Sequence, residues 1–214
     1  MNSIKNCAGK PVLLKMVAVI QQNKDYLGEV DGLIGDGDHG MNMNKGFTMF
    51  GDQIREKDID FTEGLNDLGN LLFSQIGGSM GPIYGTMFMG MAKAGERFEL
   101  IDVYNFAAML DAGLSNLQEV VQARVGDKTL IDTLVPANDA IQKAAKEGEN
   151  FADALKDMKA AAEAGRDFTK NLLSKFGRSS RLGERSRGVL DAGSVSCCLI
   201  LCAMADGILE QLGE

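Results

Sequence analysis

Residues 102–121 read DVYNFAAMLDAGLSNLQEVV and carry the clearest structural pattern in the chain. Large apolar side chains recur there at steps of three and four residues, which places them on one face of an α-helix. They are Val103, Phe106, Leu110, Leu114, Leu117 and Val121. Asp102 stands just ahead of them, where a side-chain acceptor can cap the helix. The segment therefore predicts a helix with one buried face.

The same periodicity recurs on both sides of this segment. Two further stripes run from Leu134 to Ala144 and from Phe151 to Ala162, the second with Asn150 as its expected cap. Less regular helical runs cover 11–28, 41–56, 62–76, 82–94 and 194–212, and no run of alternating polarity competes with them. Because the connections are short and rich in glycine, the sequence predicts an all-α fold, an eight-helix antiparallel up-and-down bundle forming one domain over 1–214.

Composition limits the function. The chain has 214 residues and a net charge of −8, which argues against a nucleic-acid partner because duplex phosphates require a basic surface. The run 11–20 is too short to span a membrane. Three of the four cysteines crowd one apolar segment and have no second cluster to pair with, so reduced thiols and a cytoplasmic location are expected. With His39 as the only histidine, a zinc site is disfavoured.

Residues 31–44, DGLIGDGDHGMNMN, form the densest polar motif. Asp31, Asp36 and Asp38 would repel one another unless a hard cation such as Mg²⁺ bound their oxygens. The helix expected to follow could bind phosphate at its N-terminus. The alternative is a solvated acidic turn. The spacing also matches the dinucleotide pattern G-x-G-x-x-G, but the preceding buried strand that this pattern requires is absent.

His39 lies beside these carboxylates, so its pKa is expected to be raised. As an imidazolium it could donate a hydrogen bond to a phosphate. A phosphohistidine role is the weaker alternative, because it needs a neutral ring and the approach of an anionic donor past the carboxylates.

Three further motifs are rich in glycine. Residues 77–85, GGSMGPIYG, offer backbone N–H groups to a phosphate or simply form a tight corner between helices. Residues 126–129, GDKT, read as a helix cap with a surface lysine. The third motif is residues 175–193, KFGRSSRLGERSRGVLDAG, in which 175–187 hold five basic residues and one acid. One interpretation is that its arginines bind phosphate oxygens. The other is a solvated loop. The charge of +4 on residues 175–187 leaves −12 for the rest of the chain.

In their order and spacing from about residue 10 to 210, these motifs resemble the nucleotide-binding L subunits of bacterial dihydroxyacetone kinases. The resemblance implies an eight-helix antiparallel barrel with the nucleotide capping one end. It implies that Asp31, Asp36 and Asp38 hold two Mg²⁺ ions. We assign no catalytic residue beyond these ligands. The residues implied around ADP or ATP are His39, Gly40, Met41, Asn42, Ser79, Met80, Leu130, Arg178, Asp191, Ala192 and Gly193.

The resemblance also implies a reaction. A phosphoryl group would pass from the Mg-bound nucleotide to dihydroxyacetone held covalently on a separate K subunit. The nucleotide would be either exchanging ATP or an ADP coenzyme rephosphorylated by the M subunit of a phosphotransferase system. A homodimer is expected. The alternative is a nucleotide-binding phosphocarrier or regulatory subunit that completes no kinase. The chain departs from the family at 78–82, GSMGP, where GASGP is common, and at 191–194, DAGS, where DPGA is common.

Overall fold

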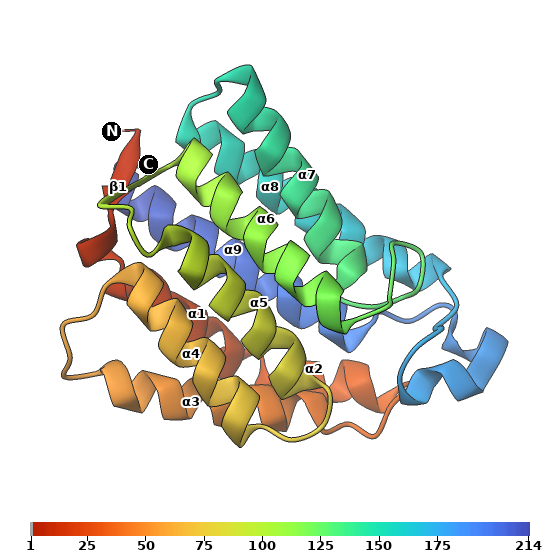
Figure 1. Ribbon diagram of the computed structural model, residues 1–214. Coiled ribbons are helices and arrows are strands. Elements are labelled where there is room, and N and C mark those ends of the chain that lie inside the picture. The colour runs from red at the N-terminus through yellow and green to blue at the C-terminus, as the bar shows by residue number, and fades with distance from the viewer. Residues whose placement is uncertain (1) are drawn as a thin grey trace.

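The computed structural model describes residues 2–214. Within them, long helices run up and down around a common core (Figure 1). The α-helices are α1 (Lys10–Gln22), α2 (Lys24–Gly32), α3 (His39–Ile54), α4 (Phe61–Gln75), α5 (Met80–Gly95), α6 (Val103–Val120), α7 (Ile131–Glu147), α8 (Phe151–Phe168) and α9 (Ala192–Leu212). Single-turn 3₁₀ segments, η1 (Asn6–Ala8) and η2 (Thr169–Asn171), and a longer one, η3 (Arg178–Ser186), lie in the connections.

The helices close into a ring. Each helix from α3 to α9 packs against the next one along the chain, and α1 joins α9 to α3. The short helix α2 lies against α3 and α9. Buried aromatic rings fill the interior, among them Phe47, Phe88 and Phe106. The prediction of an all-α antiparallel barrel is confirmed.

The first predicted helix is divided in two. At Asn23 both the backbone N–H and the side-chain Nδ2 donate to the carbonyl of Val19, at 3.1 and 2.8 Å. An asparagine side chain that competes for a backbone carbonyl in this way disfavours continuation of the helix. The run expected at 11–28 is therefore α1 and α2, and residues 2–214 contain nine α-helices instead of eight.

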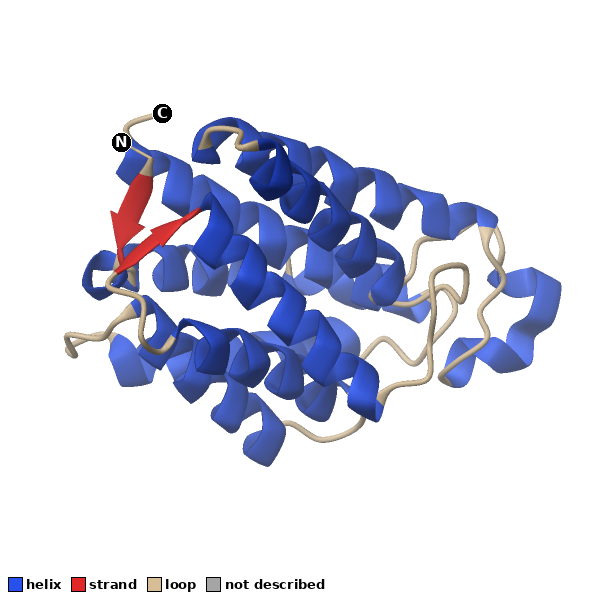
Figure 2. Cartoon of the chain, turned by 45° about the horizontal axis from the view of Figure 1, so that its top comes forward, coloured by secondary structure: helices blue, strands red, loops and turns tan. Residues whose placement is uncertain are grey.

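Two short strands were not expected. β1 (Ser3–Lys5) pairs antiparallel with β2 (Leu100–Asp102), and the buried residues Ile4 and Ile101 stand opposite each other. Strands of three residues are too short to show alternation in the sequence. Figure 2 shows this pair beside both chain ends, while the longer loops lie at the opposite end of the barrel.

Glycines were expected at the helix junctions, but several lie inside helices. Gly69 on α4 and Gly85 on α5 bring two backbones into contact: a Cβ added to Gly69 would lie 2.9 Å from the Gly85 carbonyl oxygen, and one added to Gly85 would lie 2.7 Å from that of Gly69. These glycines set how closely α4 and α5 approach.

Helix α9 is a largely buried member of the ring. Among the described helices it alone is long and apolar enough to cross a membrane, with a mean hydropathy of 1.9, but 72% of that window is buried inside the protein. It packs against α1, α2, α7 and α8. Its cysteines, Cys197, Cys198 and Cys202, are free thiols, as is the exposed Cys7.

Candidate functional site

Four helices begin at the end of the barrel away from the chain termini (Figure 1). Because successive helices alternate in direction, α3, α5, α7 and α9 all start there. Their first or capping residues, His39, Met80, Leu130 and Ala192, line one pocket of about 280 Å³. Each helix start presents unpaired N–H groups and the positive end of a helix dipole. The pocket therefore favours an anion.

Three carboxylates lie at the same pocket. Asp31, near the end of α2, and Asp36 and Asp38, in the connection to α3, each have an oxygen within 4.8 Å of the others. Burial, followed by the charges of Asp36 and Asp31, raises the pKa of Asp38. A Cβ at Gly35 would meet the Asp31 carboxylate at 2.4 Å, so a glycine is needed for the loop to fold over it. Three close carboxylate oxygens fit a hard divalent cation such as Mg²⁺.

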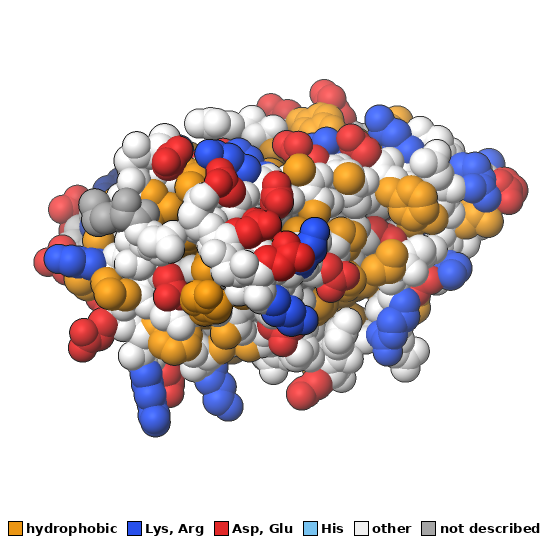
Figure 3. Space-filling view, turned by 90° about the horizontal axis from the view of Figure 1, so that it is seen from above, with side chains coloured by type: hydrophobic (Ala, Val, Ile, Leu, Met, Phe, Trp, Pro, Cys, Tyr) orange, Lys and Arg blue, Asp and Glu red, His pale blue; other side chains and the backbone are white. Residues whose placement is uncertain are grey.

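Arg178 brings positive charge to this acidic group. It lies at the start of η3, and its Nη1 is 2.9 Å from an Asp36 oxygen, with 72% of the side chain exposed. In Figure 3 several Lys and Arg side chains stand at the end of the molecule that carries η3, and others are spread with acidic side chains over the rest of that face. A guanidinium placed here can donate to a carboxylate or to phosphate oxygens.

The turn at 126–129 is stabilised by two buried charged side chains, those of Lys128 and Asp132. Asp132 accepts hydrogen bonds from the N–H groups of the first and last residues of the turn, at 2.6 and 2.8 Å. Lys128 has a left-handed backbone, with φ of 61°. Its Nζ donates to the carbonyls of Thr169 and Val189, each at 2.5 Å. The expectation of a surface lysine is wrong: Lys128 is 1% exposed, because these two carbonyls replace water around its ammonium group.

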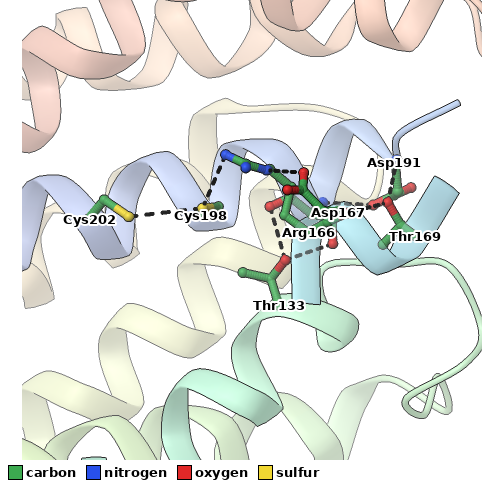
Figure 4. A network of polar contacts seen from close by, with 8 residues as sticks. Thr133, Arg166, Asp167, Thr169, Asp191, Cys198 and Cys202 are labelled. Atoms are coloured by element: carbon green, nitrogen blue, oxygen red, sulfur yellow. Dashed lines mark hydrogen bonds and ion pairs between the residues drawn. The ribbon is translucent and has the colours of Figure 1, made fainter. Parts of the chain in front are cut away.

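Asp191 is the N-cap of α9 and connects the start of that helix to η2. Its carboxylate caps the helix by accepting the Ser194 N–H at 2.7 Å, and its own N–H donates to Thr169 Oγ1 at 3.1 Å. Figure 4 shows the continuation of this network, in which the Thr169 hydroxyl donates to the carbonyl of Arg166 and the Arg166 guanidinium lies against Cys198. Burial raises the pKa of Asp191 to about 7, although its hydrogen bond from Ser194 acts in the opposite direction.

His39 is neutral rather than cationic. Its Nε2 lies 2.7 Å from Ser196 Oγ on α9. Burial lowers the pKa of His39 to about 4, and the charge of Asp31 opposes this only in part. The predicted rise in pKa is wrong because the loss of solvation outweighs the attraction of the neighbouring carboxylates.

The family model of the DAK2 domain matches residues 33–206, which is most of the chain. The chain belongs to the DAK2 domain family. It is 37% identical over 186 residues to the ADP-binding subunit DhaL of PEP-dependent dihydroxyacetone kinase 1 from Listeria innocua, covering 86% of this chain and 88% of that protein. It is 32% identical over 190 residues to the ADP-binding subunit DhaL of the Escherichia coli PEP-dependent enzyme, covering 87% and 90%.

The DAK2 fold is also found in a longer solved enzyme. The native dihydroxyacetone kinase of C. freundii superposes with a TM-score of 0.73 at 21% identity, covering 96% of this chain. A second structure of that enzyme, in complex with AMP-PNP and Mg²⁺, gives 0.71 at 20% identity. The chain spans about a third (35%) of the length of the native structure. At this identity the likeness establishes the shared fold.

Most residues expected at the nucleotide site of this DAK2 domain meet at the pocket. Those on its lining are His39, Ser79, Met80, Leu130, Arg178, Asp191, Ala192 and Gly193, together with the three carboxylates. Three expected residues in the first turn of α3 are not on the lining. Gly40 packs α3 against α2, since a Cβ there would lie 2.0 Å from the Lys24 carbonyl oxygen. Met41 is 60% exposed, and the N–H of Asn42 donates to the Asp38 carbonyl at 3.0 Å.

Several lining residues were missed from the sequence: Ile34, Tyr84, Lys128, Thr129, Phe176 and Ser179. Tyr84 follows Met80 by one helical turn, and this spacing could have placed it on the same face of α5. Lys128 had no such local signal, because its two carbonyl partners lie 41 and 61 residues further along the chain.

Proposed function

We propose that this DAK2 domain binds a Mg²⁺-nucleotide, ADP or ATP, in the pocket and serves as the nucleotide-binding subunit of a dihydroxyacetone kinase. One observation carries the proposal: three clustered carboxylates share a pocket with the starts of four helices. The carboxylates attract a divalent cation and repel bare phosphate, whereas the helix starts attract an anion. A nucleotide phosphate chain complexed with Mg²⁺ satisfies both requirements.

The residues divide into two roles. Asp31, Asp36 and Asp38 would hold the metal, and two ions are proposed. Mg²⁺, when bound, neutralises phosphate charge and aligns the transferring group with its acceptor. The helix starts orient the phosphate chain, and Arg178 can turn from Asp36 to donate to it. Of the other residues expected around the nucleotide, Ser79, Asp191 and Gly193 line the pocket and would contact its nucleoside part.

The phosphoryl acceptor would be dihydroxyacetone on a partner K subunit. In support, the relatives from Listeria innocua and Escherichia coli are named as ADP-binding subunits of PEP-dependent dihydroxyacetone kinases, and the present chain covers about nine-tenths of each. From the resemblance of its motifs to such subunits we also propose an M subunit of a phosphotransferase system as phosphoryl donor, a homodimer and a cytoplasmic location. The closed ring of helices supports the assignment of 1–214 to one domain.

Reconstitution tests this function. The purified chain is mixed with a K subunit, dihydroxyacetone and either ATP or a phosphotransferase system driven by phosphoenolpyruvate, and dihydroxyacetone phosphate is measured. Product with one donor supports the kinase and identifies the donor. Absence of product with both donors contradicts the kinase assignment and favours a phosphocarrier or regulatory subunit.

A further inference from the structure

A buried serine on α9 joins three separate parts of the pocket. Ser196 is 0% exposed, and its Oγ lies 2.7 Å from Nε2 of His39 and 2.6 Å from the hydroxyl of Tyr84. It also reaches the carbonyl oxygens of Ala192 and Gly193, both at 3.1 Å. One hydroxyl thus connects the start of α3, the first turns of α5 and the start of α9.

The number of protons in this cluster selects one tautomer of His39. Ser196 and Tyr84 have one hydroxyl proton each, and burial raises the pKa of Tyr84, so it remains a donor. If His39 is protonated on Nδ1, these two protons make only two hydrogen bonds. If it is protonated on Nε2, the cluster has three protons and makes three.

The third hydrogen bond has a ready acceptor. The Tyr84 hydroxyl lies 3.1 Å from the Gly193 carbonyl. Nε2–H of His39 can then donate to Ser196, Ser196 to Tyr84 and Tyr84 to Gly193. Each of these three contacts then has a proton between its atoms, whereas with protonation on Nδ1 either the Ser196–Tyr84 contact or the Tyr84–Gly193 contact is left without one. A buried cluster favours the arrangement with more hydrogen bonds.

We propose that Ser196 is a positioning residue that holds His39 as the Nε2–H tautomer, so that His39 offers its unprotonated Nδ1 to the ligand as a hydrogen-bond acceptor. This inference rests on the proposed nucleotide site for its ligand. An acceptor matches a donor group, such as a ribose hydroxyl, an exocyclic amine or a metal-bound water. It does not match a bare phosphate oxygen, which was the partner expected from the sequence.

The chain provides an unusually direct test, because His39 is its only histidine. Long-range ¹H–¹⁵N correlation spectra of the ¹⁵N-labelled protein at pH 8, without ligand, report the tautomer of this one ring. The wild type should show Nε2–H. Ser196→Ala should lose this preference and give a mixture of tautomers or Nδ1–H. A wild type with Nδ1–H, or unchanged populations in Ser196→Ala, would overturn the proposal.

Two further variants separate positioning from general packing. In Tyr84→Phe, Ser196 can still accept from His39 and donate to a backbone carbonyl, so the Nε2–H tautomer should persist. This variant tests the proposal even if Ser196→Ala fails to fold. Thr133→Val removes another buried hydroxyl, which contacts Ser194 on α9 at 2.8 Å, and should also leave the tautomer unchanged. Loss of the Nε2–H preference in either variant would show that Ser196 does not set it.

Binding of Mg-ADP then tests the role of the acceptor. Ser196→Ala should weaken binding about fivefold, the value of roughly one neutral hydrogen bond, while Thr133→Val should not. Equal binding by the wild type and Ser196→Ala would contradict an acceptor role for His39. If the wild type itself does not bind Mg-ADP, the proposed function fails, and the tautomer measurement, which needs no ligand, still tests the positioning by Ser196.

Discussion

Charged residues at the pocket end fall into two groups that differ in burial. Lys128 and Asp132 are each 1% exposed, and such burial is tolerated only when a charge has close polar partners. Two carbonyls surround the ammonium of Lys128, and two backbone N–H groups bind the carboxylate of Asp132. These residues therefore fix the backbone around the pocket. Asp36 and Arg178 remain accessible to a ligand.

The role of Asp36 can be tested by removing its charge alone. Asp36→Asn should weaken the binding of Mg-ADP at least about tenfold, since a charge-assisted metal contact is worth more than roughly 1.4 kcal/mol. Helix content should not change, because Asp36 lies outside the helices. Calorimetry and circular dichroism measure the two effects. Asp52→Asn, an exposed acid on α3 paired with Arg55, is the matched control and should bind normally. Undiminished binding by Asp36→Asn would disprove the metal assignment.

Asp191 predicts a dependence of stability on pH. Its folded pKa of about 7 is above the ordinary value of 3.8 for an aspartate. Folding therefore favours its protonated form, and the stability that it contributes is present below pH 3.8 and is lost as the pH rises through 7. Asn can also cap a helix. The free energy of unfolding of Asp191→Asn, measured in urea, should thus increase relative to wild type between pH 5 and pH 8. A constant difference would mean that Asp191 is ionised throughout.

At the scale of single residues, the sequence identified those whose role can be recognised from neighbouring positions in the chain. Asp31, Asp36 and Asp38 stand within eight positions, and their crowding alone predicted a cation site. Ser196 and Lys128 were not identified, because their roles depend on partners far away in the chain: His39 lies 157 positions from Ser196. For the same reason the solvation that sets the pKa of His39 could not be predicted, and the sign of its shift was wrong.

At the scale of the helices, periodicity and capping predicted most elements. Asp102 accepts the N–H of Asn105 at 2.9 Å, and Asn150 accepts that of Asp153 at 2.9 Å, so both expected caps are confirmed. The break at Asn23 was missed because Ile20 and Leu27 on its two sides are seven residues apart, which still fits one face of a continuous helix. The glycines inside α4 and α5 were missed because close approach of two helices depends on their register, which one sequence does not specify.

The contact between α4 and α5 gives a prediction about stability. Gly69→Ala should lower the free energy of unfolding by about 1–3 kcal/mol, because the new methyl group would overlap the backbone of α5. Gly28→Ala on α2 is the matched control, since its Cβ would have only an ordinary contact of 3.5 Å. It should be neutral or stabilise by up to about 1 kcal/mol through helix propensity. Equal effects of the two substitutions in urea denaturation would contradict this account of helix packing.

At the scale of the whole molecule, the closed antiparallel ring explains why the site lies where it does. Alternation in direction brings every second helix start to one end, and the connections there carry the acidic loop and the basic segment at 175–187. The net charge of −8 is therefore unevenly distributed: the basic segment contributes +4 beside three clustered carboxylates. The motifs were readable from the sequence, but their meeting in one pocket depends on the order in which the helices close.

The central claim is that this pocket binds nucleotide together with Mg²⁺. Calorimetric titration of the wild-type chain with ADP, in excess Mg²⁺ and in EDTA, tests it most directly. We predict one ADP per chain with Mg²⁺ and a loss of at least about tenfold in affinity in EDTA, since the carboxylates then repel the phosphates. No binding with Mg²⁺, or equal affinity under both conditions, would contradict the account.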